Sequence, residues 1–438
     1  MRDLLMFVIV FGLLPIVLKH PWVGAMLWTW LSIMNPHRLA WGPAFDFPFA
    51  AVVAITTTVG LLVTRDKRHI PINAVTITLL LFMLWMGVTS AFAIYPDLIG
   101  EMLRRVMKIQ FMIFVTLALL HTRKHVEIFL WIIVGCLGFY GIKGAIFTLM
   151  RSGEHRVWGP AGSFIEGNNE LALALVMTIP LIKYLHGIQT NQWIRWGLVA
   201  AMILCAMATL GTYSRGAFIA IVAMAGFLWI RNSRKLVFGS ALMIVGVTLL
   251  AFMPAAWTSR MYTIENYQLD ASATGRLNAW QMAFNLARDR LPGGGFEVAQ
   301  SEVFAYYAPD PNAIHAAHSI YFQVLGEHGF IGLALFMAFW FFTWRSAGWV
   351  RKHARRSPET QWASELAAMV QVSLVGYFVG GAFLSLAYFD LPYNMMIAIL
   401  VCRGIIEARL RGSATSPVSV TRDAPATAKV GTATRKHA

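Results

Sequence analysis

Long apolar runs follow one another along most of this chain, and they constrain its fold more than any other feature. Hydrophobic residues make up 58% of the 438 residues and charged residues only 13%, whereas a soluble protein has about 25% charged residues. A helix of about 20 apolar residues spans the roughly 30 Å hydrocarbon core of a bilayer. The composition therefore excludes a water-soluble protein and predicts an all-α polytopic membrane protein.

The apolar runs predict about twelve membrane-spanning helices. They cover residues 4–18, 22–34, 48–64, 71–93, 105–120, 126–149, 169–186, 193–210, 214–230, 235–252, 320–344, 364–388 and 391–407. The first two runs are short and Lys19, His20 and Pro21 separate them, so residues 1–34 form either one broken crossing or a hairpin that crosses twice. The start of the chain has an apolar run without a small-residue cleavage site, which indicates a retained anchor.

Positive charge orients these helices. Lysine and arginine number 36 against 21 acidic residues, a net charge of +15. Four cationic clusters lie in loops separated by even numbers of crossings, at residues 65–68, 123–124, 231–235 and 351–356. Such loops are typical of the cytoplasmic side, so the surplus gives no reason to expect a nucleic acid partner. The opposite, outer side then holds the segments near 94–104, 151–168, 211–213, 253–319 and 389–390.

The chain divides into four regions. Residues 1–252 contain the N-terminal spans, 253–319 form one long outer segment, and 320–411 contain the C-terminal spans. Residues 412–438 lack a periodic apolar pattern and are expected to form a disordered cytoplasmic tail. The outer segment is too long to be a mere connector, so we expect the chemistry on that side. The three cysteines all lie in apolar runs, which predicts core residues and no disulfide.

Within the outer segment, residues 276–290 predict a helix because apolar residues recur at spacings of three and four. These residues are Leu277, Trp280, Phe284 and Ala287. Such a helix either lies at the bilayer surface, where it would meet a lipid-linked substrate, or packs as a lid. Arg276 and Arg288 would point about 120° apart on it, so they are not expected to share one ligand.

Cations on the outer side are unexpected, because positive charge is normally scarce there. They are Arg104, Arg105, Lys108, Arg215 and Arg276. Together they could surround a small anion with several charges. Arginine presents planar, permanently charged donors that match phosphate oxygens, which makes a diphosphate the natural candidate. The alternative for each of them is to extend its charge to the lipid headgroups.

Two further features lie between these cations. Lys143 is an ionisable group inside an apolar run, which is costly enough to indicate a function, although it could instead pair with Glu170. The loop at 159–170 is rich in small and amide residues, Asn168 and Asn169 among them. Such a loop could contact a sugar or a phosphate, or it could be a plain turn that caps the next helix.

The most informative local string is HAAHSIYFQVLGEHGFIG, residues 315–332. His318 lies where the outer segment re-enters the membrane, and a neutral imidazole there can accept a proton from a hydroxyl group. A histidine that is simply hydrogen-bonded at an interface is the alternative. His315 lies three residues earlier, but no convincing third ligand accompanies the pair, so no metal is expected. Tyr321 follows in the next span as a candidate for substrate contact.

Three strings in this order resemble the bacterial O-antigen ligase and polymerase superfamily. They are Tyr213-Ser214-Arg215-Gly216, then Gly275-Arg276-Leu277-Asn278-Ala279-Trp280 with Pro292 to Phe296 following, then His318-Ser319 leading into Leu325-Gly326-Glu327-His328-Gly329. The N-terminal half, with Asn35-Pro36-His37-Arg38 and Gly141-Ile142-Lys143-Gly144, resembles the branch of O-glycosylation ligases associated with exosortase systems. The similarity spans most of the chain.

The resemblance implies a GT-C-like helical membrane fold and an inverting glycosyltransferase that uses an undecaprenyl-diphosphate-linked glycan. It implies no nucleotide and no metal cofactor, with arginines in place of a cation, and in ligases a sugar hydroxyl of lipid A-core as the acceptor. Carried onto this sequence, Arg215 and Arg276 would hold the diphosphate, with Arg288 as the second candidate on the helix. His318 would act as the base or orient the acceptor hydroxyl. The enzyme would lie in the bacterial inner membrane, with its site facing the periplasm, and make lipopolysaccharide.

Several alternatives remain open. Within the family, the chain could be a polymerase that joins repeat units on the lipid carrier, or an oligosaccharyltransferase that transfers glycan to protein. From another class, it could be a transporter of lipid-linked glycan, in which the same arginines attract the headgroup. Transporters often carry internal repeats and broken helices near the midplane, and the sequence shows neither.

Overall fold

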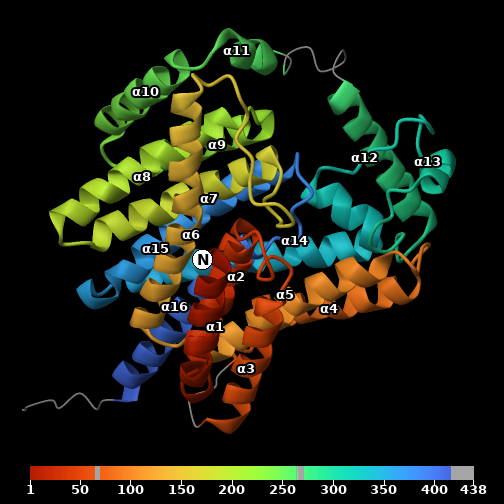
Figure 1. Ribbon diagram of the computed structural model, residues 1–438. Helices are drawn as coiled ribbons and strands as arrows, with labels where there is room; N and C mark the ends of the chain where they lie inside the picture. The colour runs from red at the N-terminus through yellow and green to blue at the C-terminus, as the bar shows by residue number, and fades with distance from the viewer. Residues whose placement is uncertain (65–69, 263, 265–270, 416–438) are drawn as a thin grey trace, which may run out of the picture.

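The computed structural model describes residues 1–64, 70–262, 264 and 271–415, and all regular structure in these ranges is helical. The helices, shown in Figure 1, are α1 (Arg2–Lys19), α2 (Pro21–Met34), α3 (Phe49–Val63), α4 (Ala74–Ala91), α5 (Ile99–Leu119), α6 (Arg123–Met150), α7 (Asn168–Ile188), α8 (Gln192–Gly211), α9 (Arg215–Arg231), α10 (Lys235–Ala251), α11 (Ala255–Tyr262), α12 (Ala271–Asp289), α13 (Ser301–Tyr307), α14 (Ile320–Ala354), α15 (Gln361–Gly381) and α16 (Asp390–Thr415), with short 3-10 helices at Pro36–Leu39 and Pro358–Thr360. The all-α prediction is confirmed.

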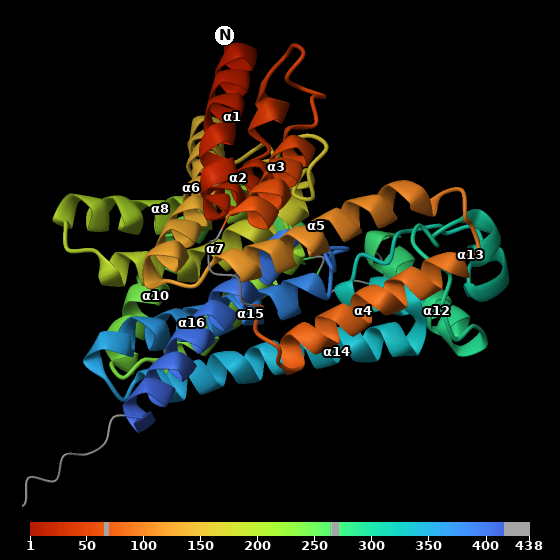
Figure 2. The same cartoon turned by 90° about the horizontal axis from the view of Figure 1, so that it is seen from below.

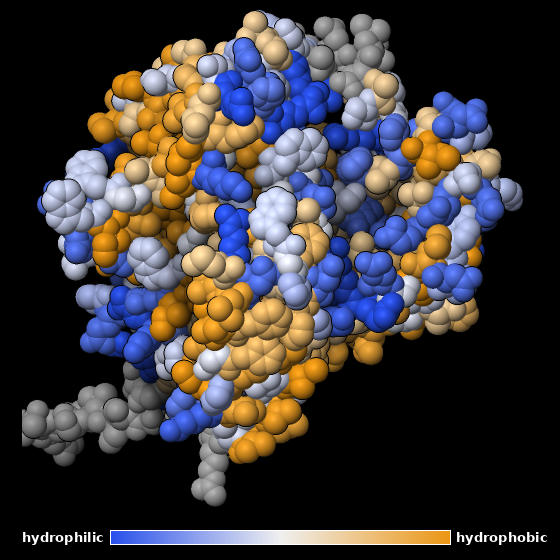
Figure 3. Space-filling model, viewed as in Figure 1, coloured by the Kyte–Doolittle hydropathy of each residue, from blue (hydrophilic) through white to orange (hydrophobic). Residues whose placement is uncertain are grey.

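Seven of the described helices are long and apolar enough to cross a membrane, or eight if the bent pair α10 and α11 is one span. The chain is therefore consistent with a polytopic membrane protein, while the predicted number of twelve spans is not confirmed. The other apolar helices are either short, with 14 residues in α2 and 15 in α3, or carry several charges, as α5 does in its first turns. Hydrophobic residues cover much of the surface over α8 and α10, whereas hydrophilic residues gather toward α11 and α12 (Figure 3).

Residues 1–34 form a hairpin of two helices, α1 and α2. Asp3 accepts a hydrogen bond from the Gly42 amide at 3.0 Å, and Arg2 donates one to the Leu39 carbonyl at 3.0 Å. The start of α1 thus lies beside the segment that follows α2, which requires the two helices to run in opposite directions. With α3 they bury a cluster of apolar side chains of their own, and Figure 2 shows the three helices projecting from the rest.

Two helices form the centre of the molecule. In α7 and α16, 72% of the apolar stretch is buried inside the protein, a larger share than in any other candidate span among the described residues. Central helices in a bundle are apolar on all sides because neighbours surround them. The candidate site lies at the amino ends of α7, one of these central helices, and of α9.

The segments predicted to lie on the outer side meet at one end of the bundle. Backbone amides of Ile94 and Val157 donate to the carbonyls of Gly294 and Gly211, at 2.9 and 3.0 Å. The rings of Phe164 and Phe389 lie 6.4 Å apart. The cationic loop predicted at 65–68 lies outside the described residues, as does the predicted tail beyond the end of α16 at Thr415.

The residues predicted to form one apolar face of the helix at 276–290 divide between its exposed and its packed sides. Leu277 is 46% exposed and Phe284 is 40% exposed. The face that packs inward consists instead of Gly275, Asn278, Ala279, Met282, Ala283, Leu286 and Ala287. A Cβ atom on Gly326 of α14 would lie only 3.2 Å from Cβ of Ala283. Helices that approach this closely need small residues at the contact, and Ala283 supplies one opposite Gly326.

Candidate active site

A tight turn between α8 and α9 positions the first candidate cation. Tyr213 takes a positive φ of 62°, and its hydroxyl donates to the Gly153 carbonyl at 2.6 Å. Ser214 then caps α9 by accepting from the Ala217 amide at 3.2 Å. Arg215 is consequently the first residue of α9, at the end of the helix where the backbone dipole is positive and attracts anions.

Three arginines from different elements line one small cavity beside this turn. They are Arg215 of α9, Arg260 of α11 and Arg276 of α12, and the other lining residues are Asn169, Ser214, Gly216, Phe383 and Leu384. The cavity volume is about 20 Å³, which is room for little more than one water molecule. Asn169 lies in the first turn of α7, so the amino ends of two helices, α7 and α9, contribute residues to the cavity.

Arg276 is the arginine of α12 that reaches this cavity. It interacts electrostatically with Glu170, in the first turn of α7. Arg288, the second candidate on the same helix, is exposed and does not line the cavity. The predicted divergence of the two side chains is therefore present in the structure.

Arg260 was not singled out in the sequence. Its Nε donates to the Tyr213 carbonyl at 3.1 Å. One turn earlier, Trp257 is buried and donates from Nε1 to the Leu210 carbonyl at 3.0 Å. These two contacts hold the eight-residue helix α11 against the turn before α9. A Trp and an Arg three residues apart were the available signal, but nothing in the sequence indicates which turn they contact.

His318 lies at the entrance to α14 in an unusual backbone conformation. Its φ is +41°, a value that non-glycine residues adopt rarely and that often accompanies function. The preceding carbonyl, of Ala317, accepts from Trp280 Nε1 at 2.7 Å, and the Trp280 ring stacks on Phe322 with centroids 4.8 Å apart. These contacts anchor the backbone next to His318 on both α12 and α14.

The environment of His318 keeps its imidazole neutral. Burial, and then the positive charge of Arg276 and the neighbouring His315, lower the pKa of His318 to about 4. A neutral imidazole at physiological pH can accept a proton. Beside it, the Ser319 Oγ is buried and has no hydrogen-bond partner among the described residues. No three His, Cys, Asp or Glu in the described ranges are grouped as a metal ion would require.

The other outward cations do not reach the cavity. Arg105 lies over the Phe164 ring at 4.0 Å and donates to the Gly162 carbonyl at 3.3 Å. Arg104 donates back to the Gly100 carbonyl of its own helix, and Lys108 is exposed. The arginine cavity is thus lined by Arg215 and Arg276 but by none of the three cations of α5.

The remaining candidates have separate surroundings. Lys143 lies on the exposed side of α6, and the described residues show no ion pair between it and Glu170. The side chain of Asn168 is buried and donates to the Thr212 carbonyl at 2.7 Å, so it holds the turn before Arg215. Tyr321 is partly buried and donates to the Phe378 carbonyl at 2.9 Å. Of the predicted substrate contacts, Asn169 alone lines the arginine cavity.

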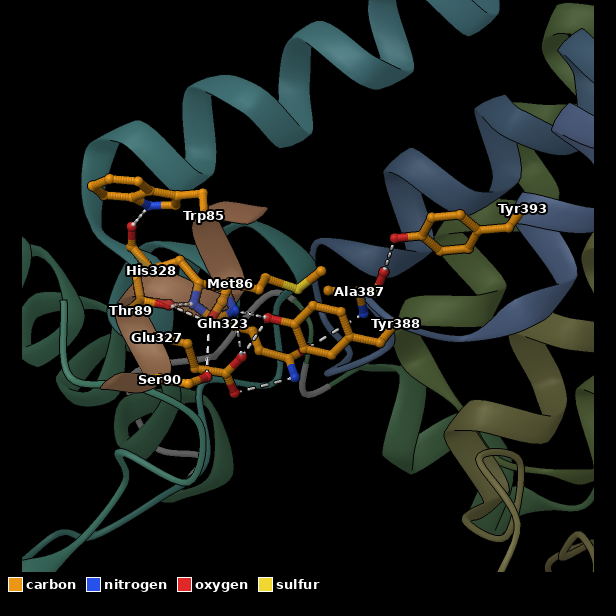
Figure 4. A network of polar contacts seen from close by, with 10 residues as sticks. All are labelled: Trp85, Met86, Thr89, Ser90, Gln323, Glu327, His328, Ala387, Tyr388 and Tyr393. Carbon is orange, nitrogen blue, oxygen red and sulfur yellow. Dashed lines mark hydrogen bonds and ion pairs between the residues drawn. The ribbon is translucent and has the colours of Figure 1, made fainter. Parts of the chain in front are cut away.

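A second polar cluster lies deeper, around His328 of α14 (Figure 4). His328 is fully buried, and its two ring nitrogens lie 2.7 Å from Thr89 Oγ1 and 2.8 Å from the Tyr388 hydroxyl. The Tyr388 hydroxyl also hydrogen-bonds the Glu327 carboxylate, while Trp85 donates to the His328 carbonyl at 2.8 Å. The cluster therefore joins α14 to α4 and to the start of α16.

This cluster coincides with a break in α14. Gly329 has a φ of +66°, and a Cβ there would lie 2.2 Å from the Leu291 carbonyl oxygen. The glycine-rich loop after α12 closes the break, because the amides of Gly294 and Gly295 donate to the carbonyls of Gly326 and Glu327, both at 2.9 Å. Carbonyls released by a broken helix need such partners inside a membrane protein. The loop thereby fixes α12, and with it Arg276, to α14.

An apolar groove of about 520 Å³ opens between α7, α8, α9 and α10. Among the described residues, Lys183 is the single charged residue that lines it. At one end of the groove, Leu210 packs with Tyr213, Met253 and Trp257. Since Tyr213 immediately precedes Ser214 and Arg215, this end of the groove lies beside the turn that carries Arg215.

Comparison with known families agrees with this geometry. Residues 1–190 match a family model described as Family of unknown function (DUF5935), and no curated protein matches the chain. Residues 172–337 match the family model described as O-Antigen ligase. That range contains the three arginines of the cavity, His318 and the glycine-rich loop. The match over residues 172–337 makes this part of the chain similar to the O-antigen ligase family, and it supports the O-antigen ligase and polymerase superfamily for the protein.

Proposed function

We propose that the protein is an O-antigen ligase, an inverting glycosyltransferase of GT-C-like fold that moves a glycan from undecaprenyl diphosphate to a sugar hydroxyl of lipid A-core. It would work in the inner membrane, with the site facing the periplasm. The observation that carries the proposal is the convergence of Arg215, Arg260 and Arg276 on one cavity next to the neutral His318.

In the proposed reaction, His318 removes the proton of the acceptor hydroxyl while its oxygen attacks the anomeric carbon from the face opposite the diphosphate. The bond between that carbon and the diphosphate oxygen breaks, and the leaving group departs with the electron pair. Negative charge then increases on the diphosphate, and the arginines and two helix amino ends are already oriented to stabilise it. The energy comes from the donor bond, so no nucleotide is required.

The apolar groove supports a lipid-linked donor. A polyprenyl chain is a long hydrocarbon, and burying it contributes about 25 cal/mol for each Å² removed from water. The groove is lined almost wholly by apolar side chains and ends beside the turn that carries Arg215. A donor with its tail in the groove would have its diphosphate beside the arginines that line the cavity.

Reconstitution tests the proposal. The purified protein is placed in lipid nanodiscs with undecaprenyl-diphosphate-linked glycan and lipid A-core, without nucleotide. We expect glycan covalently attached to lipid A-core. Longer carrier-linked chains in place of this product would identify a polymerase, and glycan on an added protein acceptor would identify an oligosaccharyltransferase. Movement of donor across vesicles without any covalent product would identify a transporter and overturn the enzyme assignment.

Two histidine variants test whether His318 is the base. We expect His318→Ala to abolish transfer, because the acceptor hydroxyl keeps its proton. His155→Ala is the matched control, since His155 is also on the outer side but is exposed and lines none of the hollows described above. Normal transfer by the His318 variant at equal protein abundance would refute its role as base.

A further inference from the structure

α12 separates two hollows of opposite character. The arginine cavity lies on the side that Arg276 faces. A second hollow of about 540 Å³ opens between α12 and the segment 309–315, and its polar lining residues include Thr274, Asn278, Gln281, Asp310 and His315. We call this hollow the polar groove. No lysine or arginine lines it within the described ranges, whereas three arginines line the cavity.

The wall of the polar groove is preformed. The Asn278 side-chain amide donates to the carbonyls of Asp310 and Ala313, at 2.8 and 3.0 Å, and its oxygen accepts from the Asp310 amide at 2.9 Å. These bonds tie the far wall to α12, so the groove does not have to form when a ligand arrives. Preformed hollows with a few fixed polar groups are typical of binding sites.

One end of the groove lies next to the reacting groups. A Cβ on Gly275 would come within 1.9 Å of the His315 ring, so the imidazole lies directly on the backbone beside Arg276. His315 is also close enough to His318 to affect its ionisation. A ligand in the groove would therefore extend away from the point where the sugar joins the diphosphate.

The two volumes restrict what each hollow accepts. About 20 Å³ in the arginine cavity leaves no room for a sugar ring. The polar groove is many times larger, is open to the surface, and offers hydroxyl, amide and imidazole groups that pair with sugar hydroxyls. With one carboxylate and no lysine or arginine in its described lining, it does not favour an anion.

We propose that the polar groove binds an uncharged saccharide, the stretch of sugars next to the reacting bond. The proposal rests on the proposed glycan transfer and extends it to a second binding site. The sugars come either from the donor glycan or from the acceptor, and both sources share the chemistry that the groove recognises.

The test fills the groove with Gln281→Trp, since Gln281 is exposed and lines it. KM is measured for two undecaprenyl diphosphate donors, one carrying a single sugar and one carrying a long chain of uncharged sugars, and separately for lipid A-core. If the donor glycan occupies the groove, we expect KM for the long donor to rise about tenfold, with no change for the short donor. If the acceptor occupies it, KM for lipid A-core rises and both donors are unaffected.

Matched variants separate filling of the groove from a general effect of added bulk. Ala305→Trp places the same bulk on an exposed position of α13 outside the groove, and it should leave all three KM values unchanged. Gln281→Ala removes the amide without adding bulk, and we expect KM to rise about threefold for the same substrate. Unchanged KM values in both Gln281 variants would overturn the groove as a saccharide site. Failure of the unaltered protein to use any donor would overturn the proposed function instead.

Discussion

The arginine cavity and the buried cluster around His328 are built on opposite electrostatic principles. The cavity gathers three arginines, with Glu170 the neighbouring carboxylate. Around His328, hydrogen bonds to Thr89 and Tyr388 satisfy both ring nitrogens. We propose that the first arrangement binds a negatively charged ligand, whereas in the second the protein itself satisfies both nitrogens of the imidazole.

The difference supports His318, and not His328, as the proposed base. His318 has a positive φ and a partly open environment. His328 is fully buried at the break in α14, where it connects three helices. A satisfied buried network rigidifies its surroundings, and here those surroundings carry the glycine-rich loop that fixes α12.

The largest effect is expected in the arginine cavity. We expect Arg215→Gln and Arg276→Gln each to lower the rate of glycan transfer by about 10²- to 10³-fold, because each removes a charge that stabilises the leaving diphosphate. Arg288→Gln should lower the rate by less than about threefold, since a surface charge outside the site contributes little. The measurement is the initial rate at saturating acceptor. Equal losses from Arg288→Gln and Arg276→Gln would remove the distinction between the two faces of α12.

A smaller loss is expected at Arg260. Arg260→Gln should weaken donor binding about tenfold, because it removes one charged donor of three. Arg260→Lys should recover part of the affinity, since lysine keeps the charge but not the planar geometry. Binding of undecaprenyl diphosphate, measured by microscale thermophoresis, distinguishes these variants. If both bound it as tightly as the unaltered protein, Arg260 would hold only the Tyr213 carbonyl.

A substitution in the buried cluster around His328 should lower the stability of the protein and change the rate of transfer little. Tyr388→Phe removes the hydroxyl shared by Glu327 and His328, and leaving buried polar groups without a partner costs about 1–3 kcal/mol. We expect a lower Tm in detergent and a transfer rate within about threefold at low temperature, with Tyr306→Phe on exposed α13 as the control. A Tyr388 variant with normal Tm but severely reduced transfer would contradict a purely structural role for the cluster around His328.

The smallest effect on glycan transfer is expected from changes of pH in the ordinary range. Because the pKa of His318 lies at about 4, its imidazole stays unprotonated well below the usual histidine value, and protonation removes its capacity as a base. kcat/KM should therefore be level from about pH 8 to about pH 5 and fall below that. His315→Asn removes one cause of the low pKa and should move the fall slightly upward. A fall centred near the ordinary histidine pKa of about 6.5 would show that His318 is not the base in this environment.

The stability of the folded protein should also depend on whether His318 is protonated. A histidine with a lowered pKa binds its proton more weakly when folded than when unfolded. The unfolded chain therefore gains stability relative to the folded protein as pH decreases from about 6.5 to about 4. His318→Asn should reduce this dependence, which thermal unfolding across that pH range would measure.

Some of the site could be predicted because membrane proteins make certain residues conspicuous. Arg215, Arg276 and His318 stood out as polar groups on the side of the bilayer where positive charge is scarce. The same rule also selected Arg104 and Lys108, which do not line the cavity. Sequence spacing gives the face of a helix on which a residue lies, but not which other helix packs against that face. It therefore could not separate the cations that line the cavity from those that do not.

The sequence by itself determined the helical class and the polar segments between the apolar runs, because hydropathy and charge act locally along the chain. It also determined that Arg276 and Arg288 diverge, because a helix has a fixed rotation per residue. The tertiary structure alone decided which side of α12 packs on α14, because that depends on the close approach at Gly326 and Ala283. It also decided that Arg260 joins the cavity, since helices remote in the sequence meet only through packing.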